Sequence, residues 1–192
     1  MTIRTTIIAS TAFLALSACG KGADTTSANV AAANQTTDTG MTSSTPTAPA
    51  MSAAQSFANA AAASDAFEIE TSRLAVSKGA SASVKSFAQN MIEGHTASTA
   101  KLMTAAAAAS PAISPDPTLS PEQQQTLDQL KTLTGSAFDQ AYIAAQTAGH
   151  QRTLDTLKSY AASGDTASLK TFASNLVPTV TAHLNTAKGL KS

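Results

Sequence analysis

From residue 51 to the end of the chain, apolar residues recur at steps of three and four, and Ala, Leu, Gln and Lys are frequent. This period is typical of amphipathic helices, because residues three and four apart lie on the same face of an α-helix. The sequence has no sustained alternation of apolar and polar residues of the kind that half-buried strands show. It therefore predicts an all-α fold.

The breaks in this period predict four long helices. Gly79 and the turn at residues 163–165 each end a segment with the helical apolar period, since glycine is frequent at helix ends. Pro178 falls inside the last helical segment and should bend that helix. The expected long helices cover about residues 52–78, 82–109 and 136–162, and then the chain from the turn at Gly164 to about residue 190.

A proline-rich link separates the second long helix from the third. Three prolines between residues 111 and 117 break the chain, and Ser120, Pro121 and Gln123 resemble an N-cap followed by a proline in the first turn. We therefore expect an extra short helix from about Ser120 to Gly135. Long helices joined by short turns pack most simply as a four-helix bundle. The link over residues 110–135 is long enough to cross the bundle, so the order of the helices stays open.

Residues 1–18 have the pattern of a cleaved lipoprotein signal peptide. Arg4 precedes an apolar run that is too short to span a bilayer, and small residues stand directly before Cys19, the only cysteine of the chain. Lipid on the Cys19 sulfur would anchor the protein in a membrane. Gly20 stands in the place of the aspartate that retains lipoproteins at the inner membrane. We therefore expect an exported protein on the periplasmic side, at the outer membrane.

The rest of the chain divides into a tether and one domain. Residues 19–50 begin with the lipidated cysteine and are rich in Ser, Thr and Ala, with too little apolar area to form a core, so we expect a disordered tether. Residues 51–192 are long enough for one helical-bundle domain.

Composition excludes several classes of function. The chain has 12 Lys plus Arg and 12 Asp plus Glu, so no basic excess favours a nucleic-acid partner. If Cys19 carries lipid, no thiol remains for a disulfide or a soft metal site. The sequence has neither a glycine-rich phosphate loop nor a Gly-x-Ser-x-Gly turn, which disfavours nucleotide binding and hydrolase triads. Catalysis is not implied.

The three histidines of the chain each fall near the middle of a different long helix, on or beside its apolar stripe. If a stripe covers about a third of a helix surface, random placement would put all three there about 4% of the time. Measured from the nearest helix turn, Glu68 and His95 differ in height by about 6 Å, and His150 and His183 by about 7 Å. Three imidazoles and the Glu68 carboxylate that converge in the core would suit one Zn, Cu or Fe ion. Candidates for supporting these ligands are Asp139, Tyr142 and Gln146.

Two other interpretations stay open. The histidines could be neutral core residues that are hydrogen-bonded to Tyr142, Gln146 or backbone carbonyls. The chain would then be a structural or envelope-stress protein that meets a protein partner. A third interpretation is a carrier of a small apolar ligand. A di-iron enzyme is disfavoured, because such bundles need glutamate three residues before histidine. The residues found at those positions are Ile92, Thr147 and Val180.

Two ordered motifs carry a family resemblance. The first motif consists of Phe67, Glu68, Ile69, Glu70, Leu74, Ala75, Val84, Lys85, Phe87, Ala88, Met91 and His95. The second consists of Gly135, Phe138, Asp139, Tyr142, Gln146, His150, Leu169, Lys170, Phe172, Ala173, Leu176, Pro178 and His183. Over about residues 53–190 the chain resembles the bacterial domain of unknown function family numbered 4142. The resemblance implies a ferritin-like four-helix bundle, usually exported and often a lipoprotein, without an established activity.

The same resemblance offers Glu68, His95, His150 and His183 as positions of interest without indicating what they bind. The sequence departs from true ferritins, because the paired Glu-x-x-His motifs are missing. This departure argues against ferroxidase activity and iron storage, even though the fold name suggests them.

Overall fold

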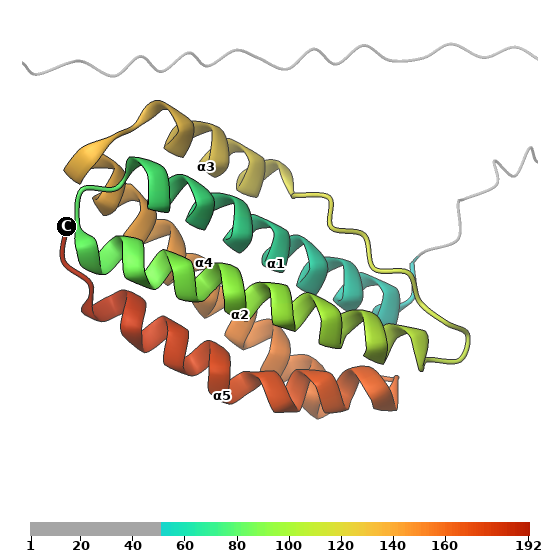
Figure 1. Cartoon of the computed structure of the whole chain (residues 1–192). Helices are drawn as coiled ribbons and strands as arrows, with labels where there is room; N and C mark the ends of the chain where they lie inside the picture. The colour runs from blue at the N-terminus through green and yellow to red at the C-terminus, as the bar shows by residue number, and fades with distance from the viewer. Residues whose placement is uncertain (1–50) are drawn as a thin grey trace, which may run out of the picture. The chain divides into compact units, whose positions relative to one another are not determined.

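The computed structural model describes residues 51–192. The predicted signal peptide, Cys19 and the tether lie outside the described residues. All named elements of the described part are helices, and they form a bundle of four long helices and one short helix (Figure 1). The helices are α1 (Ala53–Lys78), α2 (Ala82–Ala107), α3 (Pro121–Thr132), α4 (Gly135–Ser163) and α5 (Ala167–Gly189). The predicted all-α bundle with a short helix between the second and third long helices is confirmed.

Local sequence signals account for the helix ends. Ser52 precedes α1, and its side chain accepts a hydrogen bond from the backbone N–H of Gln55. The short helix α3 begins with a complete capping box. Ser120 Oγ accepts from the N–H of Gln123 at 3.2 Å, and Gln123 Oε1 accepts from the N–H of Ser120 at 2.9 Å. The N-cap predicted at Ser120 is therefore confirmed.

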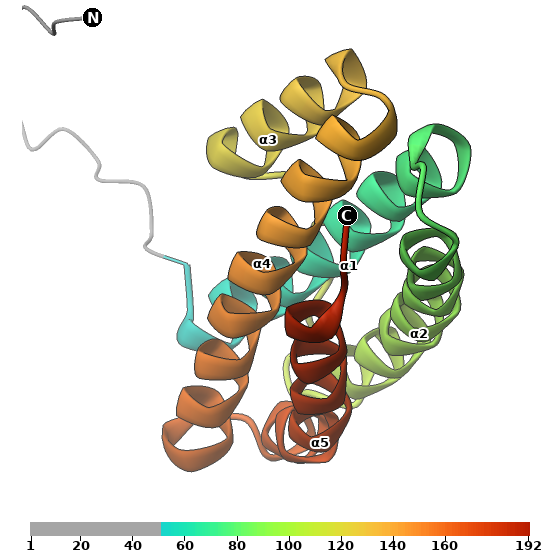
Figure 2. The same ribbon diagram turned by 90° about the vertical axis from the view of Figure 1, so that its left-hand side faces the viewer.

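The link between α2 and α4 crosses the bundle. The link and α3 run back along the bundle beside α1, so that α4 starts at the same end as α2 (Figures 1 and 2). Helix α1 packs against α2 and α4, and α5 packs against the same two helices. Neighbouring long helices are thus antiparallel, and the two helices that start together, α2 and α4, lie diagonally opposite.

A backbone contact sets the relative height of α2 and α4. Gly79 and Gly135 pair through a single parallel bridge, and Gly135 has a φ of 63°, a left-handed conformation that glycine adopts without strain. His95 follows Gly79 by 16 residues and His150 follows Gly135 by 15. Because every helical residue adds a rise of 1.5 Å, these two histidines come to nearly the same height in the bundle.

The buried core has two apolar clusters with a polar layer between them. Along α1 the order is an apolar cluster around Phe57, the polar residues from Asp65 to Ser72, and a second apolar cluster that begins at Ala75. Helices α2 and α4 pass the same layers in the reverse order, with His95 and His150 between the two clusters. His183 lies at the end of the first cluster on α5, next to Leu184. Burying polar groups costs free energy unless they find partners. Hydrophobic packing alone therefore does not explain this layer.

The predicted apolar stripes hold with exceptions. Met103 of α2 is apolar but 51% exposed, and Ala60 of α1 is also exposed. Helix α5 bends along its length in Figure 1, and Pro178 lies inside it, in agreement with the predicted bend. Among residues 51–192, no helix carries an apolar stretch long enough to cross a membrane.

Candidate metal centre

His95 on α2, His150 on α4 and His183 on α5 meet in the polar layer. Their ring centroids lie 5.5 to 5.6 Å apart in all three pairs. One ring nitrogen from each histidine lies within 4.8 Å of the other two. His95 and His150 are buried, and His183 is partly exposed. The structure thus brings together the three histidines that the sequence placed on separate helices.

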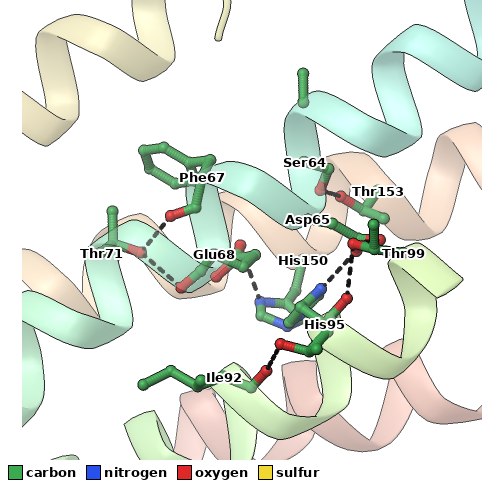
Figure 3. Close-up of polar contacts among 12 residues, drawn as sticks. Ser64, Asp65, Phe67, Glu68, Thr71, Ile92, His95, Thr99, His150 and Thr153 are labelled. Carbon is green, nitrogen blue, oxygen red and sulfur yellow. Dashed lines mark hydrogen bonds and ion pairs between the residues drawn. The ribbon is translucent and has the colours of Figure 1, made fainter. Parts of the chain in front are cut away.

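Hydrogen bonds fix the tautomers of two of these rings. His95 Nδ1 lies 2.8 Å from Asp65 Oδ1 (Figure 3 shows this contact). His150 Nδ1 lies 2.9 Å from the backbone carbonyl oxygen of Gln146. A carboxylate and a carbonyl only accept hydrogen bonds, so each Nδ1 carries a proton and donates it. In the neutral ring this leaves Nε2 with a free lone pair.

Three buried ring nitrogens are left without a partner. His95 Nε2, His150 Nε2 and His183 Nδ1 make no hydrogen bond to any of the described residues. An unpaired buried polar atom costs about 1–3 kcal/mol, and native structures contain few of them. Three such atoms on three adjacent rings therefore destabilise the fold unless something binds to them. Imidazole nitrogens of this kind are the usual ligands of Zn, Cu and Fe.

The spacing of the rings is somewhat wider than a bound ion requires. Tetrahedral zinc with Zn–N bonds of about 2.0–2.1 Å places its nitrogen ligands about 3.4 Å apart. The nitrogens here lie up to 4.8 Å from one another. Binding would therefore draw the rings together by roughly 1 Å, which is within the range of small side-chain rotations.

Glu68, expected among the ligands, lies on another edge of the His150 ring. Its Oε1 is 3.6 Å from His150 Nδ1, and its Oε2 accepts a hydrogen bond from the side-chain amide of Gln146 (Figure 3 shows the contact with His150). The unpartnered nitrogen of His150 is Nε2, so the Glu68 carboxylate stands behind this ring and not beside the three free nitrogens. Glu68 can orient His150 from this position.

The polar layer shifts the pKa values of its members in different directions. Burial raises the pKa of Glu68 to about 7, although the charge of His95 and the hydrogen bond from Gln146 act against this rise. Burial, together with the charge of His95, lowers the pKa of His150 to about 3 and that of His183 to about 4. These two rings are therefore neutral at pH 7.

His95 behaves differently from the other two histidines. Burial disfavours its charged form, but the hydrogen bond to Asp65 and the nearby Glu68 carboxylate outweigh burial and raise the pKa of His95. His95 is thus the ring of the three that holds a proton most strongly.

The other predicted supporting residues have separate roles. Gln146 links Glu68 and His150, because its side chain donates to Glu68 and its carbonyl accepts from His150. Tyr142 shares a 2.7 Å hydrogen bond with Ser72, and burial raises the pKa of its phenol, which stays neutral. Asp139 accepts from the backbone N–H groups of residues 80 and 81 and so holds the turn between α1 and α2. It precedes His150 by 11 residues, or about 16 Å along α4, so it does not support the histidines.

Two glycines make room for the polar layer. A Cβ atom at Gly94 would lie 3.1 Å from His183 Cε1, and a Cβ atom at Gly149 would lie 2.9 Å from Glu68 Oε1. Glycine inside a helix costs about 1 kcal/mol relative to alanine. Since both positions lie inside long helices, the close approach of His183 and Glu68 accounts for the glycines.

Sequence analysis missed Asp65, the closest partner of His95. Asp65 is buried, and its second oxygen accepts a hydrogen bond from Thr99 at 3.2 Å. A signal was present, because Asp65 stands three residues before Glu68 and therefore on the same face of α1.

A comparison with protein families gives one match. The family model described as "Domain of unknown function (DUF4142)" matches residues 39–190, which include all five helices. The resemblance noted in the sequence is thereby confirmed. No curated protein and no solved structure is significantly similar to the chain.

Proposed function

We propose that this chain, which belongs to the DUF4142 family of unknown function, binds one transition-metal ion. The ligands are His95 Nε2, His150 Nε2 and His183 Nδ1. One observation carries the proposal, namely that these three buried nitrogens on adjacent rings have no hydrogen-bond partner among the described residues. An ion at this place would satisfy all three of them at once.

The groups behind the rings support the same proposal. Histidine ligands of metals usually donate their second N–H to a carboxylate or a backbone carbonyl, which orients the ring and strengthens it as a ligand. Asp65 provides a carboxylate behind His95, and the Gln146 carbonyl takes this position behind His150. A purely structural role for the histidines would leave the three inner nitrogens unpaired.

The donor set narrows the class of metal. Three imidazoles without a thiolate suit Zn, Cu or Fe and are poor ligands for Ca or Mg, which prefer oxygen. Because the pKa of His95 is raised, metal binding competes with a proton on this ring. His183 is the partly exposed ligand, so the ion enters from its side of the bundle.

A zinc titration of the purified chain tests the proposal. We expect calorimetry to give one equivalent of bound Zn²⁺ and to show proton release, as a heat that depends on the ionisation enthalpy of the buffer. His95→Ala should abolish this binding, whereas the control Gln151→Ala, an exposed position on α4, should retain it. Absence of stoichiometric binding of Zn, Cu and Fe to the wild type would refute the proposal, and the structural or envelope-stress alternative would then be favoured.

We also propose that the domain is tethered to the periplasmic side of the outer membrane. The support comes from the sequence, in which Cys19 follows a signal-like segment and residues 20–50 are polar and of low complexity. Metabolic labelling with a palmitate analogue should mark the wild type but not Cys19→Ser. If the wild type acquires no label, this proposal is wrong.

A further inference from the structure

A cavity of about 380 Å³ lies between α1, α4 and the segment that leads into α3. We propose that it is a binding site for a small organic amine, with the apolar part of the amine between the helices and its ammonium group on Glu68. This proposal does not depend on the metal, because the cavity reaches Glu68 and not the inner nitrogens of the histidines.

The walls of the cavity suit an apolar body. Phe57 and Phe67 line it from α1, and Leu157 lines it from α4, together with small alanine side chains. A volume of this size lies at the lower end of the range for small-molecule sites, which are mostly apolar with a few well-placed polar groups. The ligand class is therefore a compact molecule with an aromatic or aliphatic body.

Glu68 supplies the charged group of the site. Its side chain lines the cavity although the residue is only 2% exposed. Oε2 accepts a hydrogen bond from Gln146, whereas Oε1 lies 3.6 Å from His150 Nδ1. That nitrogen already donates to the Gln146 carbonyl. Oε1 is therefore a buried carboxylate oxygen with unused capacity to accept hydrogen bonds.

The residues around Glu68 leave its carboxylate accessible from the cavity. Gly149 also lines the cavity, and a side chain at this position would press on Glu68 Oε1, since its Cβ would lie only 2.9 Å away. One helical turn further along, Ser64 Oγ and Thr153 Oγ1 share a 2.8 Å hydrogen bond across the two helices (Figure 3). Their oxygens can accept further hydrogen bonds beside the carboxylate.

Charge selects an amine over other ligands of the same size. An ammonium group offers three N–H donors and a positive charge, whereas an alcohol offers one donor and no charge. A buried carboxylate is costly unless an opposite charge pairs with it, and an anionic ligand would be repelled. Arg152 at the cavity rim is paired with Glu122, so its charge is compensated there.

An NMR titration of the ¹⁵N-labelled full chain tests this site, with benzylammonium, benzyl alcohol and phenylacetate as probes. We expect benzylammonium to bind saturably and to shift the backbone amides of Glu68, Gly149 and Thr153. Benzyl alcohol and phenylacetate should bind about tenfold more weakly or worse, since hydrogen bonds to a charged group are the stronger ones.

Variants then locate the ammonium group. Glu68→Gln keeps the shape of the side chain and should weaken benzylammonium binding about tenfold or more. Gln151→Ala, an exposed position on α4 that does not line the cavity, should leave it unchanged. If Glu68→Gln does not fold, the comparison of the three probes on the wild type still decides. Absence of saturable shifts, shifts elsewhere in the bundle, equal binding of the alcohol, or full affinity in a folded Glu68→Gln would overturn the proposal. A zinc titration that shows no metal binding would refute the metal site but would not affect the proposed amine site.

Discussion

His95 Nδ1 lies 2.8 Å from Oδ1 of Asp65, and each of the two side chains is about 5% exposed. The carboxylate thus keeps the proton on Nδ1 and leaves the lone pair of Nε2 free, on a ring that lies beside His150 and His183 (Figure 3 shows the pair). This arrangement matches the carboxylate–histidine pairs that orient ligands in zinc proteins. It gives Asp65 a measurable role in metal affinity.

Asp65→Asn should weaken zinc binding by about 10- to 100-fold, the usual effect of removing a carboxylate behind a histidine ligand. The amide keeps the size of the side chain, so the bundle should still fold. Competition against a chelator of known affinity measures the change. Asp155→Asn, an exposed carboxylate on α4, is the matched control and should bind zinc as the wild type does. An unchanged affinity in Asp65→Asn would show that this hydrogen bond does not position a ligand.

Gly94→Ala should lower zinc affinity about tenfold even though alanine favours the helix by about 1 kcal/mol. The added Cβ would lie 3.1 Å from His183 Cε1, so the ring has to shift by a few tenths of an ångström from its position beside the other two histidines. Calorimetry of zinc binding measures the effect. Gly189→Ala, where an added Cβ has no neighbour within 4 Å, should leave the affinity unchanged. Wild-type affinity in Gly94→Ala would mean that His183 does not need its present position.

Asp139→Ala should destabilise the fold without affecting metal binding. The carboxylate accepts a 2.8 Å hydrogen bond from the N–H of Ser81 and holds the start of α2. Its loss leaves backbone donors unpaired, and we expect the free energy of unfolding to fall by about 1–3 kcal/mol. Urea denaturation measures this change, and a zinc titration in the absence of urea should match the wild type. A large loss of zinc affinity in the folded variant would instead link Asp139 to the metal centre.

The metal-free protein should lose stability as the pH falls below about 6.5, the unperturbed pKa of histidine. The pKa values of His150 and His183 are lowered to about 3 and about 4 in the folded state, so the unfolded state takes up protons that the folded state does not. Each proton that only the unfolded state binds lowers the free energy of unfolding by about 1.4 kcal/mol for every pH unit of acidification. Their contribution to stability is thus present above pH 6.5 and declines in acid.

Glu68 acts in the opposite sense. In the folded state its pKa is raised from 4.5 to about 7. Its contribution to the free energy of unfolding is therefore fully present below pH 4.5 and is lost as the pH rises towards 7. Between pH 4.5 and 6.5 it partly cancels the effect of the histidines. Urea denaturation at several pH values should therefore show a steeper acid loss in Glu68→Gln than in the wild type. Equal slopes in the two proteins would contradict these pKa shifts.

The helices could be predicted from the sequence because their signals are local. The apolar period and Gly79 placed the ends of the first three long helices within two residues of the observed ends. The N-cap signal at Ser120 located the start of α3. The crossover could not be predicted, since a link of that length also permits other topologies. The bridge between Gly79 and Gly135 joins segments far apart in the chain, and no local pattern indicates it.

The candidate site was predictable only in part. The positions of the three histidines on apolar stripes indicated that they would converge. The partner of His95 was missed, because α1 is rich in alanine on all sides and its faces differ little in hydrophobicity. The place of Glu68 behind His150 depends on side-chain conformation, which the spacing of residues along a helix does not determine.

The position of a bound ion tests the central claim most directly. Crystals of the protein grown with zinc can be measured on both sides of the zinc absorption edge, so that anomalous scattering locates the metal. The account predicts one strong peak about 2.0–2.1 Å from His95 Nε2, His150 Nε2 and His183 Nδ1, with Asp65 still bonded to His95. A zinc peak elsewhere, or no peak among the three rings at saturating zinc, would contradict it.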